Sequence, residues 1–112
     1  KWLSEAFVNI LDNAIKYSEE NTKISIHIMK LNQMVRIEFK DQGMGIPDEE
    51  KHNIFKRFYR GINSDLADGS GVGLYLARRI ISEHHGTIMV KDNMVNGEKK
   101  GSIFVVHIPI IK

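Results

Sequence analysis

The apolar residues of the chain recur at two periods, and the change of period separates helices from strands. Over residues 2–18 the spacing is that of one helix face. Residues 22–30 and 33–40 instead alternate apolar and polar, which predicts two strands joined by a hairpin at residues 31–32. The apolar positions are Leu3, Phe7, Ile10, Leu11, Ala14 and Ile15 on the helix, Ile24, Ile26 and Ile28 on the first strand, and Val35, Ile37 and Phe39 on the second.

The second half of the chain repeats this order after an irregular stretch. Pro47 and the acids after it predict a short helix, and residues 61–69 lack periodicity and predict a mobile loop. A second long helix is expected over residues 73–85, ended by Gly86 at the C′ position. Two further strands are expected at 87–92 and 102–108, with a turn at Asn96-Gly97. Antiparallel hairpins that carry helices on one side predict an α+β, two-layer sandwich.

Composition narrows the class of protein. The 112 residues predict a single domain, 1–112, and the absence of cysteine excludes a disulfide framework and fits a reducing compartment. Sixteen basic against fourteen acidic residues give 16 − 14 = +2, and their scatter predicts no attraction to nucleic acid or membranes. No apolar run approaches the roughly 20 residues of a spanning helix. The chain begins at Lys1 already in a helical pattern, so we expect it to be a piece of a longer protein.

A polar stripe runs along the first helix beside its apolar face. Glu5, Asn9, Asn13 and Lys16 fall within about 80° of one another at 100° per residue. Asparagine is a poor helix former, so two of them one turn apart ask for a reason. They are either part of a solvated face or oxygen ligands for Mg²⁺, with Lys16 placed for a metal-bound phosphate.

The segment DQGMGIP, residues 41–47, follows the end of the second strand. Its glycines permit a positive φ or a close approach of the backbone to a ligand. The segment is either an ordinary turn or a purine site. In the purine interpretation, the Asp41 carboxylate accepts a hydrogen bond from an exocyclic amine.

The segment GSGVGL, residues 69–74, opens the second long helix. Backbone N–H groups at a glycine-rich helix entry favour a bound anion such as phosphate. The segment is not a Walker A loop, because no Gly-Lys-Ser/Thr ends it, and its glycine spacing is not that of a dinucleotide-binding fold.

Taken together, these segments resemble the ATP-binding catalytic domain of bacterial two-component sensor histidine kinases, within the Bergerat-fold ATPases that include DNA gyrase B. NILDNAIKYS (9–18), DQGMGIP (41–47), IFKRFYRG (54–61) and GSGVGL (69–74) match the N, G1, F and G2 boxes. EHHGTI (83–88) and GSIF (101–104) match the closing segments. The resemblance implies a mixed, mostly antiparallel sheet with helices on one face and a mobile ATP lid over residues 46–70.

The resemblance also implies a role for each matching residue. Asn13 would coordinate Mg²⁺ with Asn9 on the phosphate side, Lys16 and Tyr17 would reach phosphate or ribose, and Asp41 would accept the adenine amino group. Arg57 or Arg60 of the lid would meet the γ-phosphate; the sequence does not decide which, and Asn9, Lys16 and Arg60 are the expected catalytic residues. The other nucleotide-binding positions are Gly43, Gly45, Ile46, Gly69, Ser70, Gly71, Val72, Gly73, Leu74 and Ser102.

Phosphate transfer is favoured over ATP hydrolysis. In the ATP-hydrolysing members of the superfamily that this chain resembles, the first N-box position is a Glu that activates water. Here that position is Asn9, whose amide cannot act as a general base. One alternative is a hydrolysing or serine-phosphorylating relative on the same fold. The other is a degenerate regulatory module without turnover, and only this second alternative is disfavoured by the intact Asn13, Asp41, Gly71 and Gly73. Phe55 and Phe58 either pack inside the lid or, by the resemblance, contact the histidine-bearing domain.

The partners and location follow from the resemblance and from the histidines of the chain. None of the five lies in the dimerisation-helix context of the family's phosphoacceptor, so the acceptor is expected on a separate domain upstream. The expected function is therefore Mg-ATP binding and transfer of the γ-phosphate to that domain, with a response regulator engaged by the parent protein. The domain alone is expected to be monomeric, to be cytoplasmic and to belong to a membrane-anchored sensor.

Overall fold

The structure is a computed structural model that describes residues 2–18, 22–51, 53–56 and 73–110. The order of its elements confirms the predicted order, with strand bounds shifted by a few residues. The elements are α1 (Trp2–Tyr17), β1 (Ser25–Leu31), β2 (Met34–Lys40), the 3₁₀ helix η1 (Asp48–Glu50), α2 (Gly73–Glu83), β3 (Thr87–Val95) and β4 (Glu98–Pro109).

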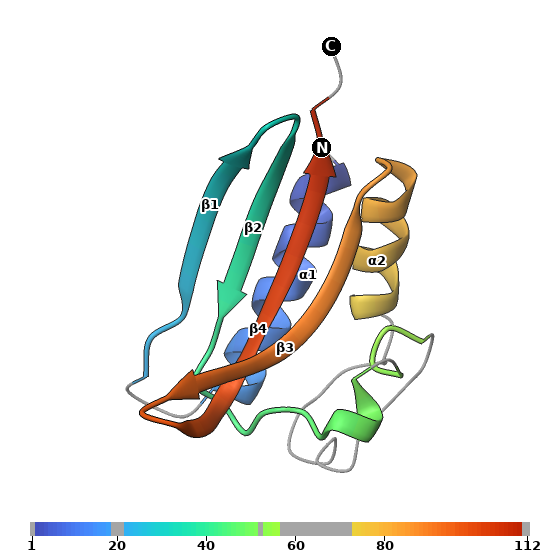
Figure 1. The fold of residues 1–112 in the computed structure, drawn as a ribbon. Helices are drawn as coiled ribbons and strands as arrows, with labels where there is room; N and C mark the ends of the chain where they lie inside the picture. Colours follow the sequence, from blue (N-terminus) through green and yellow to red (C-terminus); the bar gives the residue numbers. More distant parts are fainter. Residues whose placement is uncertain (1, 19–21, 52, 57–72, 111–112) are drawn as a thin grey trace.

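The four strands form one sheet in the order β1-β2-β4-β3, and each neighbouring pair in the described residues is antiparallel. Both long helices lie on the same face of this sheet (Figure 1). The predicted α+β two-layer sandwich is therefore confirmed. Long connections carry the chain from β2 to β3 through η1 and α2, so β4 returns between them at the centre of the sheet.

Residues with a positive φ make both hairpin turns. Asn32 has a φ of 52° between β1 and β2, and Asn96 and Gly97 have φ values of 53° and 81° between β3 and β4. Two consecutive positive φ angles match the right-handed twist of the flanking strands, which is why Asn-Gly favours such turns. The predicted hairpin at Asn96-Gly97 is confirmed.

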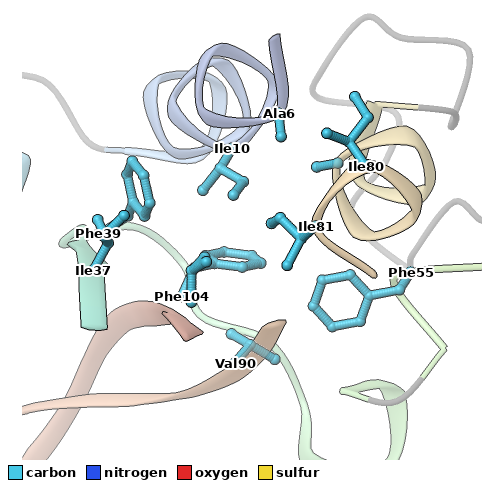
Figure 2. Close-up of a cluster of buried hydrophobic side chains, with 11 residues drawn as sticks. Ala6, Ile10, Ile37, Phe39, Phe55, Ile80, Ile81, Val90 and Phe104 are labelled. Atoms are coloured by element: carbon cyan, nitrogen blue, oxygen red, sulfur yellow. The ribbon is translucent and has the colours of Figure 1, made fainter. Parts of the chain in front are cut away.

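The hydrophobic core lies between the two helices and the sheet (Figure 2). On α1 its most buried residues are Ala6, Ile10 and Ala14, each at most 1% exposed. The predicted apolar face was rotated toward Ile15, which is 56% exposed. The small alanines explain the difference, because they let α1 lie close to its neighbours while bulkier residues take the flanks.

The strand β1 forms one edge of the sheet. Ile26 and Ile28 pair with Phe39 and Ile37 of β2, so they share the face that carries the core, as the alternation predicted. They are nevertheless 48% and 70% exposed. The reason is lateral position, because α1 runs behind β2 and β4 rather than behind the edge strand (Figure 1).

The helix α2 ends at Glu83, two residues before the predicted end, and its C′ residue is also different from the predicted one. The left-handed residue is His85, with a φ of 64°, and Gly86 comes one position later. The Gly86 N–H donates to the carbonyl of Ile81 at 2.9 Å, which closes a Schellman motif with His85 at C′. Gly86 is required for space instead, since a Cβ there would lie 2.4 Å from the carbonyl oxygen of His107.

Candidate functional site

The buried carboxylate of Asp41 lies just beyond the end of β2 and is 4% exposed. The backbone N–H of Asp41 donates to the Ser102 carbonyl at 2.9 Å. Its Oδ1 accepts hydrogen bonds from the N–H groups of Gly43, at 3.0 Å, and Ser102, at 3.1 Å. Both bonds use the same carboxylate oxygen, so neither occupies Oδ2.

Burial changes the acid–base behaviour of this carboxylate. Desolvation raises the pKa of Asp41 above its ordinary value, and the hydrogen bonds from Gly43 and Ser102 oppose that rise. A poorly solvated carboxylate with one oxygen already fixed is a directional acceptor for an N–H donor. Such a site discriminates strongly against analogues that lack the donor, because the buried acceptor is then left unpaired.

Two glycines shape the backbone around Asp41. Gly101 has a φ of 104°, and a Cβ there would lie 2.2 Å from the Asp41 carbonyl oxygen. Gly45 has a φ of 75°, which L side chains rarely adopt. The loop after Asp41 and the start of β4 are therefore shaped by backbone alone at these positions.

The polar face of α1 comes to the same region at its C-terminal end. Ser18, next after α1, forms an isolated antiparallel bridge with Gly43, and its hydroxyl donates to the Ala14 carbonyl at 2.7 Å. Asn9 and Asn13 are partly buried on α1, and Lys16 is exposed. Tyr17 is the last residue of α1. The bridge thus joins the helix carrying the predicted Mg²⁺ and phosphate residues to the loop carrying the predicted base-recognition residues.

The remaining predicted positions lie on β4, on the loop after β2 and at the start of α2. Ser102 is 4% exposed on β4, and Ile46 packs against the core. Gly73 is the first residue of α2, and Leu74 after it also packs against the core. Outside the described residues lie the predicted sites Arg57, Arg60, Gly69, Ser70, Gly71 and Val72, as well as Phe58 and most of the predicted lid.

The described beginning of the predicted lid is anchored in two ways. Phe55 is 6% exposed and packs edge-on against Phe104 of β4 with ring centroids 6.2 Å apart, so it lies in the main hydrophobic core rather than inside the lid. The Lys51 ammonium donates to the Ile46 carbonyl at 3.1 Å and pairs with Asp92 of β3 at 2.9 Å. Residues 46–51 and 53–55 are thereby held against the core and against β3.

Three residues that shape this region were not among the predicted site residues. Gly101 stands in the GSIF motif, so the motif could have pointed to it. Asn93 donates from Nδ2 to the Asp41 carbonyl at 2.8 Å, and Lys51 makes the contacts just described. Neither follows a sequence pattern, because each depends on where β3 passes the loop after β2.

The fold, the buried carboxylate after β2 and the glycine-rich sequence before α2 together indicate the family of proteins to which the chain belongs. The family model described as histidine kinase-, DNA gyrase B-, and HSP90-like ATPase matches residues 1–112. The chain belongs to this family. Its curated relatives are named as sensor histidine kinases, which confirms the resemblance predicted from the motifs.

Two curated relatives illustrate the similarity. The chain is 34% identical over 108 residues to the signal transduction histidine-protein kinase/phosphatase MprB of Mycolicibacterium paratuberculosis, covering 96% of this chain and 21% of MprB. It is 37% identical over 111 residues to the adaptive-response sensory kinase SasA of Gloeothece citriformis, covering 98% of this chain and 27% of SasA. The chain thus spans about a fifth to a quarter of these relatives.

Solved structures show the same fold. The mycobacterial sensor histidine kinase MprB matches with a TM-score of 0.84 at 28% identity, over 94% of this chain and 68% of that one. The nucleotide-free catalytic domain of histidine kinase ThkA matches with a TM-score of 0.80 at 31% identity, over 96% and 67%. A structure of ThkA in complex with the response regulator TrrA matches with a TM-score of 0.73 at 29% identity, over 95% and 28%.

Proposed function

We propose that this domain binds Mg-ATP and donates the γ-phosphate to a histidine on a separate dimerisation domain, as the catalytic domain of a two-component sensor histidine kinase. The observation that carries the proposal is the Asp41 carboxylate, which is buried and fixed through Oδ1 while neither of these bonds uses Oδ2. This arrangement suits an acceptor for the adenine amino group. Family membership and the names of the relatives support the same nucleotide.

The residues on the polar face of α1 fit the phosphate and metal part of the nucleotide. Mg²⁺ takes one or two protein oxygens together with phosphate oxygens, so the neutral amide of Asn13 suits it and Asn9 completes the polar face. When bound, the metal would neutralise charge on the phosphates. Lys16 and Tyr17 would hold phosphate or ribose, and Arg60 or Arg57 would meet the γ-phosphate.

The loops on either side complete the proposed site. Gly43, Gly45 and Ile46 would line the base pocket together with Ser102. The glycine-rich segment would follow the phosphates, and residues 46–70 would form the lid within the single domain 1–112. The members of the segment are Gly69, Ser70, Gly71, Val72, Gly73 and Leu74. Positioning and charge neutralisation are the main sources of rate in phosphoryl transfer.

Transfer is favoured over hydrolysis by the residue at position 9. Asn9 faces the same side of α1 as Asn13, and its amide cannot take a proton from water at neutral pH. The base for the transfer would therefore come from the acceptor domain of the parent protein. We place that parent at the membrane, with this domain in the cytoplasm. The next partner is a response regulator, by analogy with the kinase–regulator complex of ThkA.

A phosphotransfer assay tests the proposal. The chain is mixed with γ-labelled ATP, Mg²⁺ and the histidine-bearing domain of its parent protein, and acid-labile label on that domain is measured. The proposal predicts label that disappears with Asp41→Asn and with replacement of the acceptor histidine by Gln. If the chain released inorganic phosphate from ATP equally fast with and without the acceptor domain, the result would contradict the proposal and favour a hydrolysing relative.

A further inference from the structure

A buried amide side chain supports the backbone of the candidate base-recognition residue. Asn93 of β3 is 4% exposed, and its Nδ2 donates to the Asp41 carbonyl oxygen at 2.8 Å. The two residues are 52 positions apart in the chain, so this contact is tertiary and exists only in the folded sheet.

Asn93 lies at a shift in the register between β3 and β4. In the β3–β4 register Asp92 pairs with Ser102 and Met94 pairs with Lys99, and the ladder shifts between the two pairs. Asn93 therefore lies outside the regular ladder, opposite two residues of β4, Lys100 and Gly101. β-Bulges of this kind re-aim a side chain and recur beside functional sites.

Four hydrogen bonds hold Asp41 at three of its polar groups, which are the backbone N–H, the backbone carbonyl and Oδ1. Its N–H is bound by the Ser102 carbonyl, and its Oδ1 by the N–H groups of Gly43 and Ser102. Its carbonyl oxygen is bound by Asn93, which is the one side chain among these partners. The N–H and the carbonyl of one residue belong to the two planar peptide units that flank its tetrahedral Cα, so holding both restricts the direction of the Cα–Cβ bond. Asn93 thus holds one of the two main-chain groups that set the Cα–Cβ direction of Asp41.

We propose that Asn93 is a positioning residue for base recognition, which sets the orientation of Asp41 and with it the preference for a 6-aminopurine over a 6-oxopurine. This rests on the proposed nucleotide function. The role differs from that of a buried structural amide in one measurable way. A structural amide affects stability or the binding of every nucleotide, whereas a positioning residue affects the contribution of the exocyclic amine alone.

The experiment compares two nucleotides by isothermal titration of the 112-residue chain in Mg²⁺. The probes are adenosine diphosphate, which carries the amine, and inosine diphosphate, which carries an oxygen in its place. The variants are Asn93→Ala and Asn93→Ser, and the control is Met94→Ala, a neighbour in β3 whose side chain is 55% exposed. Each variant is first checked for a cooperative melt.

The wild type and Met94→Ala are expected to prefer adenosine diphosphate. In Asn93→Ala its Kd should rise about tenfold, the equivalent of one hydrogen bond, while the Kd of inosine diphosphate changes less than about twofold. Asn93→Ser keeps a donor hydroxyl on a shorter side chain, so its Kd for adenosine diphosphate should lie between those of the wild type and Asn93→Ala.

Each other outcome overturns a defined part of the account. An unchanged ratio in folded Asn93→Ala overturns the positioning role while the wild-type preference stands. An equal loss for both nucleotides overturns it in favour of a structural amide, and so does failure of both variants to fold. No preference in the wild type itself overturns the proposed base site first, which keeps the two failures apart.

Discussion

Gly101 lies against Asp41 so closely that no side chain fits between them. A Cβ on Gly101 would stand 2.2 Å from the Asp41 carbonyl oxygen and 2.8 Å from its Oδ1. A close approach of this kind needs glycine, and the φ of 104° at Gly101 needs it independently. The candidate base site is therefore defined by a contact between two segments 60 residues apart.

Gly101→Ala is expected to remove nucleotide binding and to lower the free energy of unfolding by about 3 kcal/mol, because clash and backbone strain add. Urea unfolding and titration with Mg-ADP measure the two effects. Gly97→Ala is the matched control, since Gly97 has a φ of 81° but nothing within 4 Å of its Cβ position. The free energy of unfolding of Gly97→Ala should fall by only about 1 kcal/mol, and this variant should bind Mg-ADP as the wild type does. Equal losses in the two variants would contradict the contact.

Asp41→Asn is expected to stabilise the chain while weakening adenine binding. Burial raises the pKa of Asp41, so the stability it contributes is fully present below its unfolded value of 3.8 and is lost as the pH rises through the folded value. Asparagine keeps an oxygen for Gly43 and Ser102 without the charge. At pH 7 the gain should be about 0.5–1 kcal/mol, narrowing toward pH 4. Urea unfolding at both pH values measures it, and a loss at pH 7 would contradict it.

The opposite pH dependence is expected for Asp92. The hydrogen bond from Lys51 and its positive charge lower the pKa of Asp92, so its stabilising contribution is present above 3.8 and is lost as the pH falls. Asp92→Asn should lower the free energy of unfolding by about 1 kcal/mol at pH 7. Below pH 4 the free energies of unfolding of the variant and the wild type should become equal. A double-mutant cycle with Lys51→Met isolates the pair, and additive single losses would show that the two groups do not interact.

Phe55→Ala is expected to lower the free energy of unfolding by about 3 kcal/mol, because it removes a ring packed on Phe104 from the core. Thermal melting of the isolated chain measures the loss. Ile28→Ala is the control, as Ile28 is a large apolar residue that is 70% exposed, and it should change stability little. A normal melt for Phe55→Ala would assign Phe55 to a contact with another domain.

Much of the fold could be predicted from the sequence because its signals are local. The change from helical to alternating spacing gave the elements, and Asn96-Gly97 gave a turn whose two positive φ values the structure contains. The side of α1 that faces the core was less predictable. Helical periodicity locates the face only broadly, and Ala6 rather than Ile15 lies inside because close packing favours the smaller residue.

The candidate site was predictable where a motif carries it and not where tertiary contacts do. Asp41 and Gly45 stand in the segment DQGMGIP, and the buried carboxylate and the positive φ are both present in the structure. Asn93 gave no sequence signal, because its hydrogen bond to Asp41 depends on a shift in the β3–β4 register. The ion pair of Lys51 with Asp92 likewise depends on how the segment after Pro47 meets β3.

The most direct test of the central claim is a thermal melt with and without Mg-ADP, run in parallel on the wild type and Asp41→Asn. A ligand at 100 times its Kd stabilises the folded state by about 2.7 kcal/mol, which raises the Tm measurably. The account predicts a rise in the wild type and almost none in Asp41→Asn, placing the adenine at Asp41. An equal rise in both proteins would contradict that placement, and no rise in either would contradict nucleotide binding by this domain.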